Sequence, residues 1–94
     1  MNRFRLIVSS PDGTIFDGEA VMLTLRGIAG DLAILAGHIP FVTTVVPCDC
    51  KIELEDETER LAHTDGGLLT VSADAVTLLS GSFRWKEPNE TGEA

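Results

Sequence analysis

The sequence has 94 residues, a length that supports one hydrophobic core and not two. Its formal net charge of −8, from 15 acidic residues against 7 Lys and Arg, excludes the basic surface that nucleic-acid binding requires. Its longest apolar stretches, such as residues 41–46, fall far short of the ~18 to 20 residues of a membrane span, and no signal peptide is visible. We therefore expect one folded domain with no nucleic-acid partner and no direct membrane insertion.

The first half of the chain predicts five short strands. They cover residues 4–9, 14–16, 21–25, 31–35 and 41–46, which are rich in β-branched, aliphatic and aromatic side chains. Between residues 21 and 25 the apolar side chains fall at every second position, so they share one face of a strand. Pro11, Asp12 and Gly13 predict one turn, and Gly27 and Gly30 permit positive φ in another.

The second half predicts four more strands. They cover residues 50–55, 59–64, 68–72 and 76–80. In the first of them, Cys50, Ile52 and Leu54 point to one buried face while the side chains between them point to water. Leu54, Thr58 and Leu61 also have the spacing of a short amphipathic helix, but the clean alternation before them favours a hairpin that turns at residues 56–58.

These short, one-sided strands predict an all-β fold, because each apolar face must pack against another. The economical arrangement is a two-sheet β-sandwich of about eight to ten short strands. We assign residues 1–85 to this domain. Residues 86–94 have no apolar side chain before the final Ala94 and predict a flexible polar tail.

Few residues in the chain suggest chemistry. Cys48 and Cys50 are too far apart on an extended strand for a disulfide. A zinc site needs about four converging ligands, and the two Cys and the widely spaced His38 and His63 are not expected to converge. The acidic run at residues 53–59 lacks the spacing of a calcium loop and is typical of a solvated hairpin. We therefore expect free structural thiols and no bound metal.

His38, in a loop containing Gly37 and Pro40, is the first catalytic candidate. It has no nucleophile motif to accompany it, so an enzyme is not expected. Residues 27–30 lack the Gly-Lys-Ser/Thr ending of a phosphate loop. The sequence thus predicts no catalytic residue, no cofactor and no small-molecule ligand.

Residues 30–40 read Gly-Asp-Leu-Ala-Ile-Leu-Ala-Gly-His-Ile-Pro and resemble the signature of bacterial F-type ATP synthase epsilon subunits. Gly30, an acidic residue, the Gly37-His38 pair and Pro40 all fall in register with the family pattern. Ala33 and Ala36 depart from it, because the family usually has Gly and Pro there. The resemblance extends over about residues 4–85, which is the N-terminal β-sandwich of the family. The C-terminal helical hairpin that usually follows is missing, which implies a short form.

The resemblance implies a non-catalytic central-stalk (rotor) subunit that links the gamma subunit to the membrane c ring and couples ion flow to ATP synthesis. Such a protein lies peripherally at the cytoplasmic face of the bacterial inner (plasma) membrane. By analogy, Ala29, Gly30, Asp31 and Leu32 contact the c ring, and Ser10 and His38 lie near gamma. The alternative is a free-standing β-sandwich protein-binding module of another system.

Overall fold

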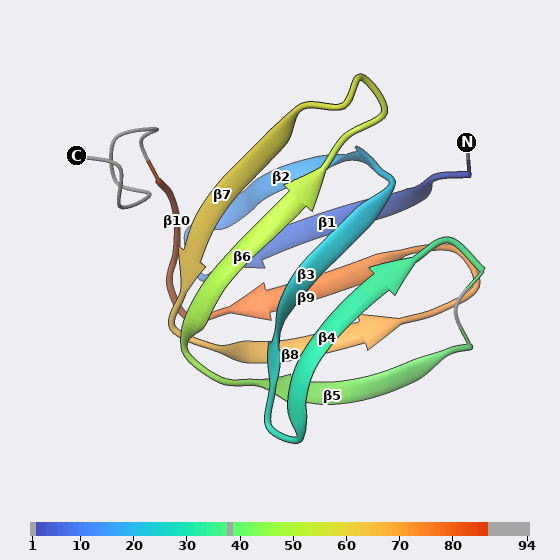
Figure 1. The fold of residues 1–94 in the computed structure, drawn as a ribbon. Coiled ribbons are helices and arrows are strands. Elements are labelled where there is room, and N and C mark those ends of the chain that lie inside the picture. The colour runs from blue at the N-terminus through green and yellow to red at the C-terminus, as the bar shows by residue number, and fades with distance from the viewer. Residues whose placement is uncertain (1, 38, 87–94) are drawn as a thin grey trace.

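The computed structural model describes residues 2–37 and 39–86, and the regular structure of these residues consists of strands alone (Figure 1). The strands are β1 (Phe4–Ser10), β2 (Gly13–Ala20), β3 (Met22–Gly27), β4 (Gly30–Leu35), β5 (Phe41–Val45), β6 (Cys48–Glu53), β7 (Glu59–Thr64), β8 (Gly67–Val71), β9 (Val76–Ser80) and β10 (Phe83–Trp85). The predicted all-β fold is confirmed. Within the same residues no helix is long and apolar enough to cross a membrane.

The strands form two layers. Layer 1 has the order β5-β8-β9-β1-β2, and layer 2 has the order β10-β7-β6-β3 with β4 on the other side of β3. In Figure 1, β3 and β6 of layer 2 cross in front of β9 and β1 of layer 1. The layers join at one corner, where Gly27 pairs with Val45 and the N–H of Ile28 donates to the carbonyl of Thr44 at 2.9 Å. The predicted sandwich is therefore folded from one continuous sheet.

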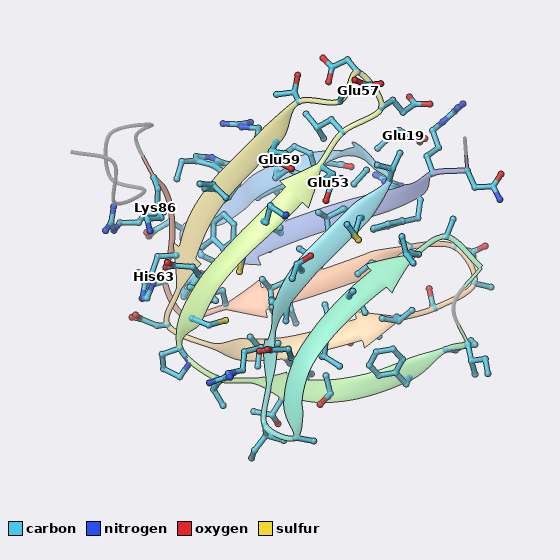
Figure 2. All side chains as sticks on the ribbon, in the orientation of Figure 1. Glu19, Glu53, Glu57, Glu59, His63 and Lys86 are labelled. Carbon is cyan, nitrogen blue, oxygen red and sulfur yellow. The ribbon has the colours of Figure 1, made fainter. Side chains whose placement is uncertain are left out.

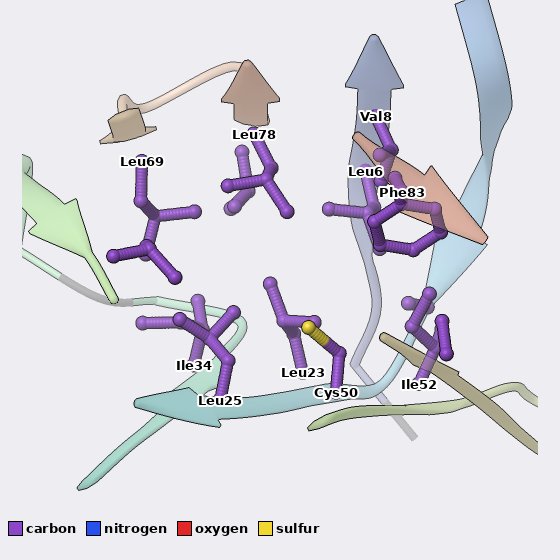
Figure 3. Close-up of a cluster of buried hydrophobic side chains, with 14 of the residues drawn as sticks. Leu6, Val8, Leu23, Leu25, Ile34, Cys50, Ile52, Leu69, Leu78 and Phe83 are labelled. Carbon is purple, nitrogen blue, oxygen red and sulfur yellow. The ribbon is translucent and has the colours of Figure 1, made fainter. Parts of the chain in front are cut away.

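The hydrophobic core lies between the two layers (Figure 3). Its position follows from the alternation of apolar and polar residues in the sequence, because every second side chain of a strand points inward. The large side chains that are fully buried come from both layers: Leu6, Leu23, Ile34, Ile52, Leu69 and Leu78. Burying one such side chain contributes about 1.5 to 3 kcal/mol, so this cluster is the main source of stability.

The segment from Leu54 to Leu61, whose spacing also allowed a short helix, is part of a hairpin. β6 and β7 pair from Cys48 with Thr64 to Glu53 with Glu59, and the N–H of Leu54 donates to the carbonyl of Thr58 at 2.9 Å. The helical alternative is therefore wrong. The side chain of Asp56 accepts a bond from the N–H of Thr58 at 3.0 Å, which is the local turn chemistry expected of Asp.

Two strands differ from the prediction. The strand predicted at residues 14–16 is β2, which runs on to Ala20 and pairs along the whole of β1. β10, which pairs antiparallel with β7, was not predicted from the sequence. Next to it, Lys86, the first residue of the predicted tail, donates its N–H to the carbonyl of Leu61 at 2.9 Å, while residues 87–94 lie outside the described residues.

The pairing register sorts the connections to two ends of the sandwich. The first end, here called the turn end, carries the β1–β2, β3–β4, β5–β6, β7–β8 and β9–β10 connections. The opposite end, here called the loop end, carries the β6–β7 and β8–β9 turns, the end of β4 at Leu35 and the start of β5 at Phe41. This division decides which of the predicted site residues lie together.

Candidate functional site

The four residues predicted to contact the c ring lie in the β3–β4 turn and at the start of β4. Gly27 pairs with Gly30, which leaves Ile28 and Ala29 at the apex of the turn. Gly30 has a φ of 131°, which a residue with a side chain adopts only at a cost. Ile28 is 71% exposed, an unusual position for a large aliphatic residue. The turn therefore presents an apolar apex at the turn end of the sandwich.

Gly27 does not have the positive φ that its place in a Gly-rich turn suggested. It is needed for close packing instead. A Cβ at this position would lie 3.0 Å from Cδ1 of Leu32 and 3.4 Å from the carbonyl oxygen of Thr44. Gly27 thus allows β4 and β5 to approach β3 at the corner where the layers join. Leu32 in turn packs its half-buried side chain against the core.

Asp31 lies directly across from Arg26 in the β3–β4 pairing. The guanidinium Nε of Arg26 donates to Oδ1 of Asp31 at 3.0 Å, and the two side chains are 59% and 76% exposed. An ion pair this exposed contributes only about 0 to 1 kcal/mol to stability. Most of the Asp31 carboxylate remains open to solvent, so it is available to a basic group on another protein.

Of the two residues predicted to lie near gamma, the structure describes only Ser10. Ser10 ends β1 at the turn end, where its Oγ accepts the N–H of Asp12 at 3.2 Å. His38 lies outside the described residues. Its neighbours Gly37 and Ile39 are at the loop end, and Ile39 is 81% exposed. The structure thus brings Ser10 to the same end of the sandwich as residues 29–32.

A polar cluster that was not predicted from the sequence joins β6, β7 and the residue that follows β10 on layer 2. Asp49 of β6 contacts Nδ1 of His63 through Oδ1 at 2.9 Å and accepts from Nζ of Lys86 through Oδ2 at 2.9 Å. Figure 2 labels His63 and Lys86, which come from β7 and the residue after β10. The cluster fastens Lys86 to the sheet. Only the strand register reveals it, because 37 residues separate Asp49 from Lys86.

This cluster predicts a dependence of stability on pH. The hydrogen bonds from His63 and then Lys86 lower the pKa of the Asp49 carboxyl. A lowered pKa means that the ionised form stabilises the folded state above the unfolded value of about 3.9, and that this contribution is lost as the pH falls further. We expect Asp49→Asn to reduce the loss of unfolding free energy between about pH 5 and pH 2. Urea unfolding across this range measures it, and an unchanged slope would contradict the assignment.

The loop end has a hollow of about 560 Å³ whose walls include Arg3, Arg5 and Glu19. Both arginines already have carboxylate partners: Arg3 pairs with Glu19 and with Glu55, and Arg5 pairs with Asp17. The hollow therefore offers no uncompensated cation to an anionic ligand. Cys48 and Cys50 are free thiols. Among residues 2–37 and 39–86, no three His, Cys, Asp or Glu side chains gather as a metal site.

The sequence matches one family model over residues 3–86, that of the ATP synthase, delta/epsilon chain, beta-sandwich domain. ATP synthase epsilon chains from three strains of Clostridium perfringens are 35% identical to it over 94 residues, which are 100% of this chain and 69% of each relative. The predicted resemblance is therefore confirmed.

Two solved structures share the fold. One is a chain in the cryo-EM structure of the Euglena gracilis mitochondrial ATP synthase, OSCP/F1/c-ring in rotational state 1, with a TM-score of 0.84 and 21% identity. The match covers 94% of this chain and 57% of the Euglena chain, so this chain spans little more than half of that relative. The other belongs to the central stalk/c-ring structure of the Tetrahymena thermophila mitochondrial ATP synthase, with a TM-score of 0.73, 16% identity, and coverage of 98% and 73%. With the family match over nearly the whole sandwich, these findings show that the chain belongs to the ATP synthase delta/epsilon chain family.

Proposed function

We propose that this chain is a non-catalytic rotor subunit of a bacterial ATP synthase. It links the gamma subunit to the c ring, so that rotation of the ring by ion flow is transmitted to ATP synthesis on other subunits. The observation that carries the proposal is the family sandwich with the exposed β3–β4 turn at one end, where an apolar apex at Ile28 stands beside the carboxylate of Asp31. The relatives in solved structures come from central-stalk and c-ring assemblies, which supports the same partners.

The proposal assigns the contacts as follows. Ala29, Gly30, Asp31 and Leu32 face the ring, and Ser10 and His38 lie near gamma. The 76% exposure of Asp31 supports the first assignment, because a charge that meets a partner must be reachable. The protein is then peripheral, at the cytoplasmic face of the inner (plasma) membrane, where it binds protein partners.

Binding to an ATP synthase core tests the proposal directly. We expect the purified chain to bind a core that contains gamma and the c ring but has been stripped of its own epsilon subunit. Its binding should reach one chain per core and restore ion pumping driven by ATP. Sedimentation of the core with labelled chain measures binding, and a core that retains its epsilon subunit is the control. A chain that stays free in solution would favour the free-standing binding module and overturn the rotor assignment.

A further inference from the structure

β3 and β4 form a two-stranded ribbon at the edge of layer 2. Within the described residues, β4 pairs with β3 alone, and β6 accompanies β3 only from Met22 to Thr24. From Leu25 to the apex at Ile28, the ribbon therefore has no β6 beside it. A two-stranded ribbon by itself is marginally stable at best in water. This end of the ribbon, which carries the turn assigned to the ring contact, needs support from another element.

Backbone hydrogen bonds from layer 1 take the place of β6. The N–H of Ile28 donates to the carbonyl of Thr44 at 2.9 Å. The N–H of Val46 donates to the carbonyl of Arg26 at 3.1 Å, and the N–H of Arg26 donates to Sγ of Cys48 at 3.3 Å. Thr44 lies in β5 of layer 1, which runs beside the β3–β4 turn in Figure 1. The end of the ribbon is thus bonded to the opposite layer of the sandwich.

The corner where the layers join is also closely packed, with a glycine on each side of the end of β5. A Cβ on Gly27 would lie 3.0 Å from Cδ1 of Leu32 and 3.4 Å from the carbonyl oxygen of Thr44. On the other side, a Cβ on Gly66 of the β7–β8 turn would lie 2.5 Å from the carbonyl oxygen of Val45. Val45 itself is 2% exposed. The end of β5 is therefore held between the ribbon and the β7–β8 turn.

We propose that Gly27 is a positioning residue for the ring contact, an inference that rests on the proposed rotor function. Having no side chain, it lets the ribbon lie close enough to β5 for the backbone bonds of Ile28 and Arg26 to form. A subunit that transmits rotation must resist displacement where it meets the ring, and a contact is most precise when rigid elements support it. Force on the β3–β4 turn then passes through these bonds into layer 1, and the ribbon does not have to resist it alone.

Hydrogen exchange of Gly27→Val tests the structural half of the proposal. Valine suits a strand, and Gly27 has no positive φ, so the effect of the substitution comes from the loss of close approach to β5. We expect the amide of Ile28 to exchange at least about tenfold faster, because weakening its bond to Thr44 favours local opening. Amides of β1 and β9 report the global stability, and the Ile28 amide should accelerate more than they do. Nuclear magnetic resonance of the free chain measures both.

ATP-driven pumping by the epsilon-stripped core, supplied with each variant, tests the functional half. We expect Gly27→Val to lower the ions pumped per ATP hydrolysed at least about threefold, because a displaced contact binds more weakly. Gly27→Ala should lower it less, since the closest obstruction is the flexible end of Leu32. Ile52→Val is the control, because it trims a fully buried side chain of β6 toward the loop end, away from the corner. It should lower the urea midpoint and leave pumping at the wild-type level.

Three outcomes would overturn the proposal. The first is an unchanged exchange rate of the Ile28 amide in Gly27→Val. The second is wild-type pumping by a Gly27→Val chain whose Ile28 amide exchanges faster, because the ring contact would then not depend on the corner. The third is an equal loss of pumping in Gly27→Ala and Ile52→Val at equal stability, which would assign the effect to stability alone. If Gly27→Val shows no cooperative unfolding in urea, Gly27→Ala takes its place in both measurements, with smaller changes in the same direction. Failure of the wild type to bind the core would instead reject the rotor function itself.

Discussion

Replacing Gly67 with alanine is expected to destabilise the sandwich by at least about 3 kcal/mol, enough to unfold much of a domain of this size. Gly67 begins β8 and pairs with Val45 on one side and Ser80 on the other. Its φ is 156°, and a Cβ there would overlap the carbonyl oxygen of Leu79. The obstructing atom belongs to the backbone of the neighbouring strand, so the strands must separate because no flexible side chain can yield.

Two other glycines serve as controls for this substitution. Gly81 has no positive φ and open space around the added carbon, so Gly81→Ala should leave the unfolding free energy within about 1 kcal/mol of the wild type. Gly13 has a φ of 128° but also open space, so Gly13→Ala isolates the cost of the backbone conformation. Urea unfolding followed by the fluorescence of Trp85 measures all three. A Gly67→Ala protein as stable as Gly81→Ala would contradict the steric argument.

Most strands were predictable because burial on one face imposes a period of two on the sequence. The segment around Cys50 and Ile52 shows this plainly, and both residues are buried where the alternation placed them. β10 was not predictable in the same way, because three residues cannot display a period. Its place depends on contacts made only in the folded chain: pairing with β7, and the edge-to-face contact of Trp85 with Phe16, at 5.9 Å between ring centroids.

The candidate site was predictable only in part. The β3–β4 turn is local, so its glycines and Asp31 could be identified from consecutive residues. The outward side chains of β8 and β9 could not, because Leu68 and Leu69, like Leu78 and Leu79, are adjacent apolar residues of one strand. One of each pair points to the core and the other to solvent, and periodicity cannot decide which when both are leucine. The strand pairing decides it, by burying Leu69 and Leu78.

Asp31→Lys is expected to weaken the coupling between ATP hydrolysis and ion pumping while leaving the fold intact. A charge-assisted hydrogen bond from Asp31 to a basic group of the ring would contribute about 1.5 to 3 kcal/mol, so its loss should lower affinity about 10- to 100-fold. The fold should tolerate the change, because the exposed pair with Arg26 contributes only about 0 to 1 kcal/mol. Pumping by reconstituted vesicles, with the epsilon-stripped core supplied with each variant, measures the coupling.

The observed pair with Arg26 provides a control that distinguishes it from the proposed contact of Asp31 with the ring. In the double variant Arg26→Asp with Asp31→Lys, the cross-strand ion pair is restored with reversed polarity, but the carboxylate no longer stands at position 31. If Asp31 acts only by pairing with Arg26, the double variant should pump like the wild type. If it acts on the ring, the double variant should remain as impaired as Asp31→Lys alone, and this is the result we expect. Asp31→Asn, which keeps the shape and removes the charge, should pump at a level between the wild type and Asp31→Lys, because a neutral acceptor retains part of a hydrogen bond to a cation. If Asp31→Lys pumps as well as the wild type, the carboxylate of Asp31 does not contribute to the contact with the ring.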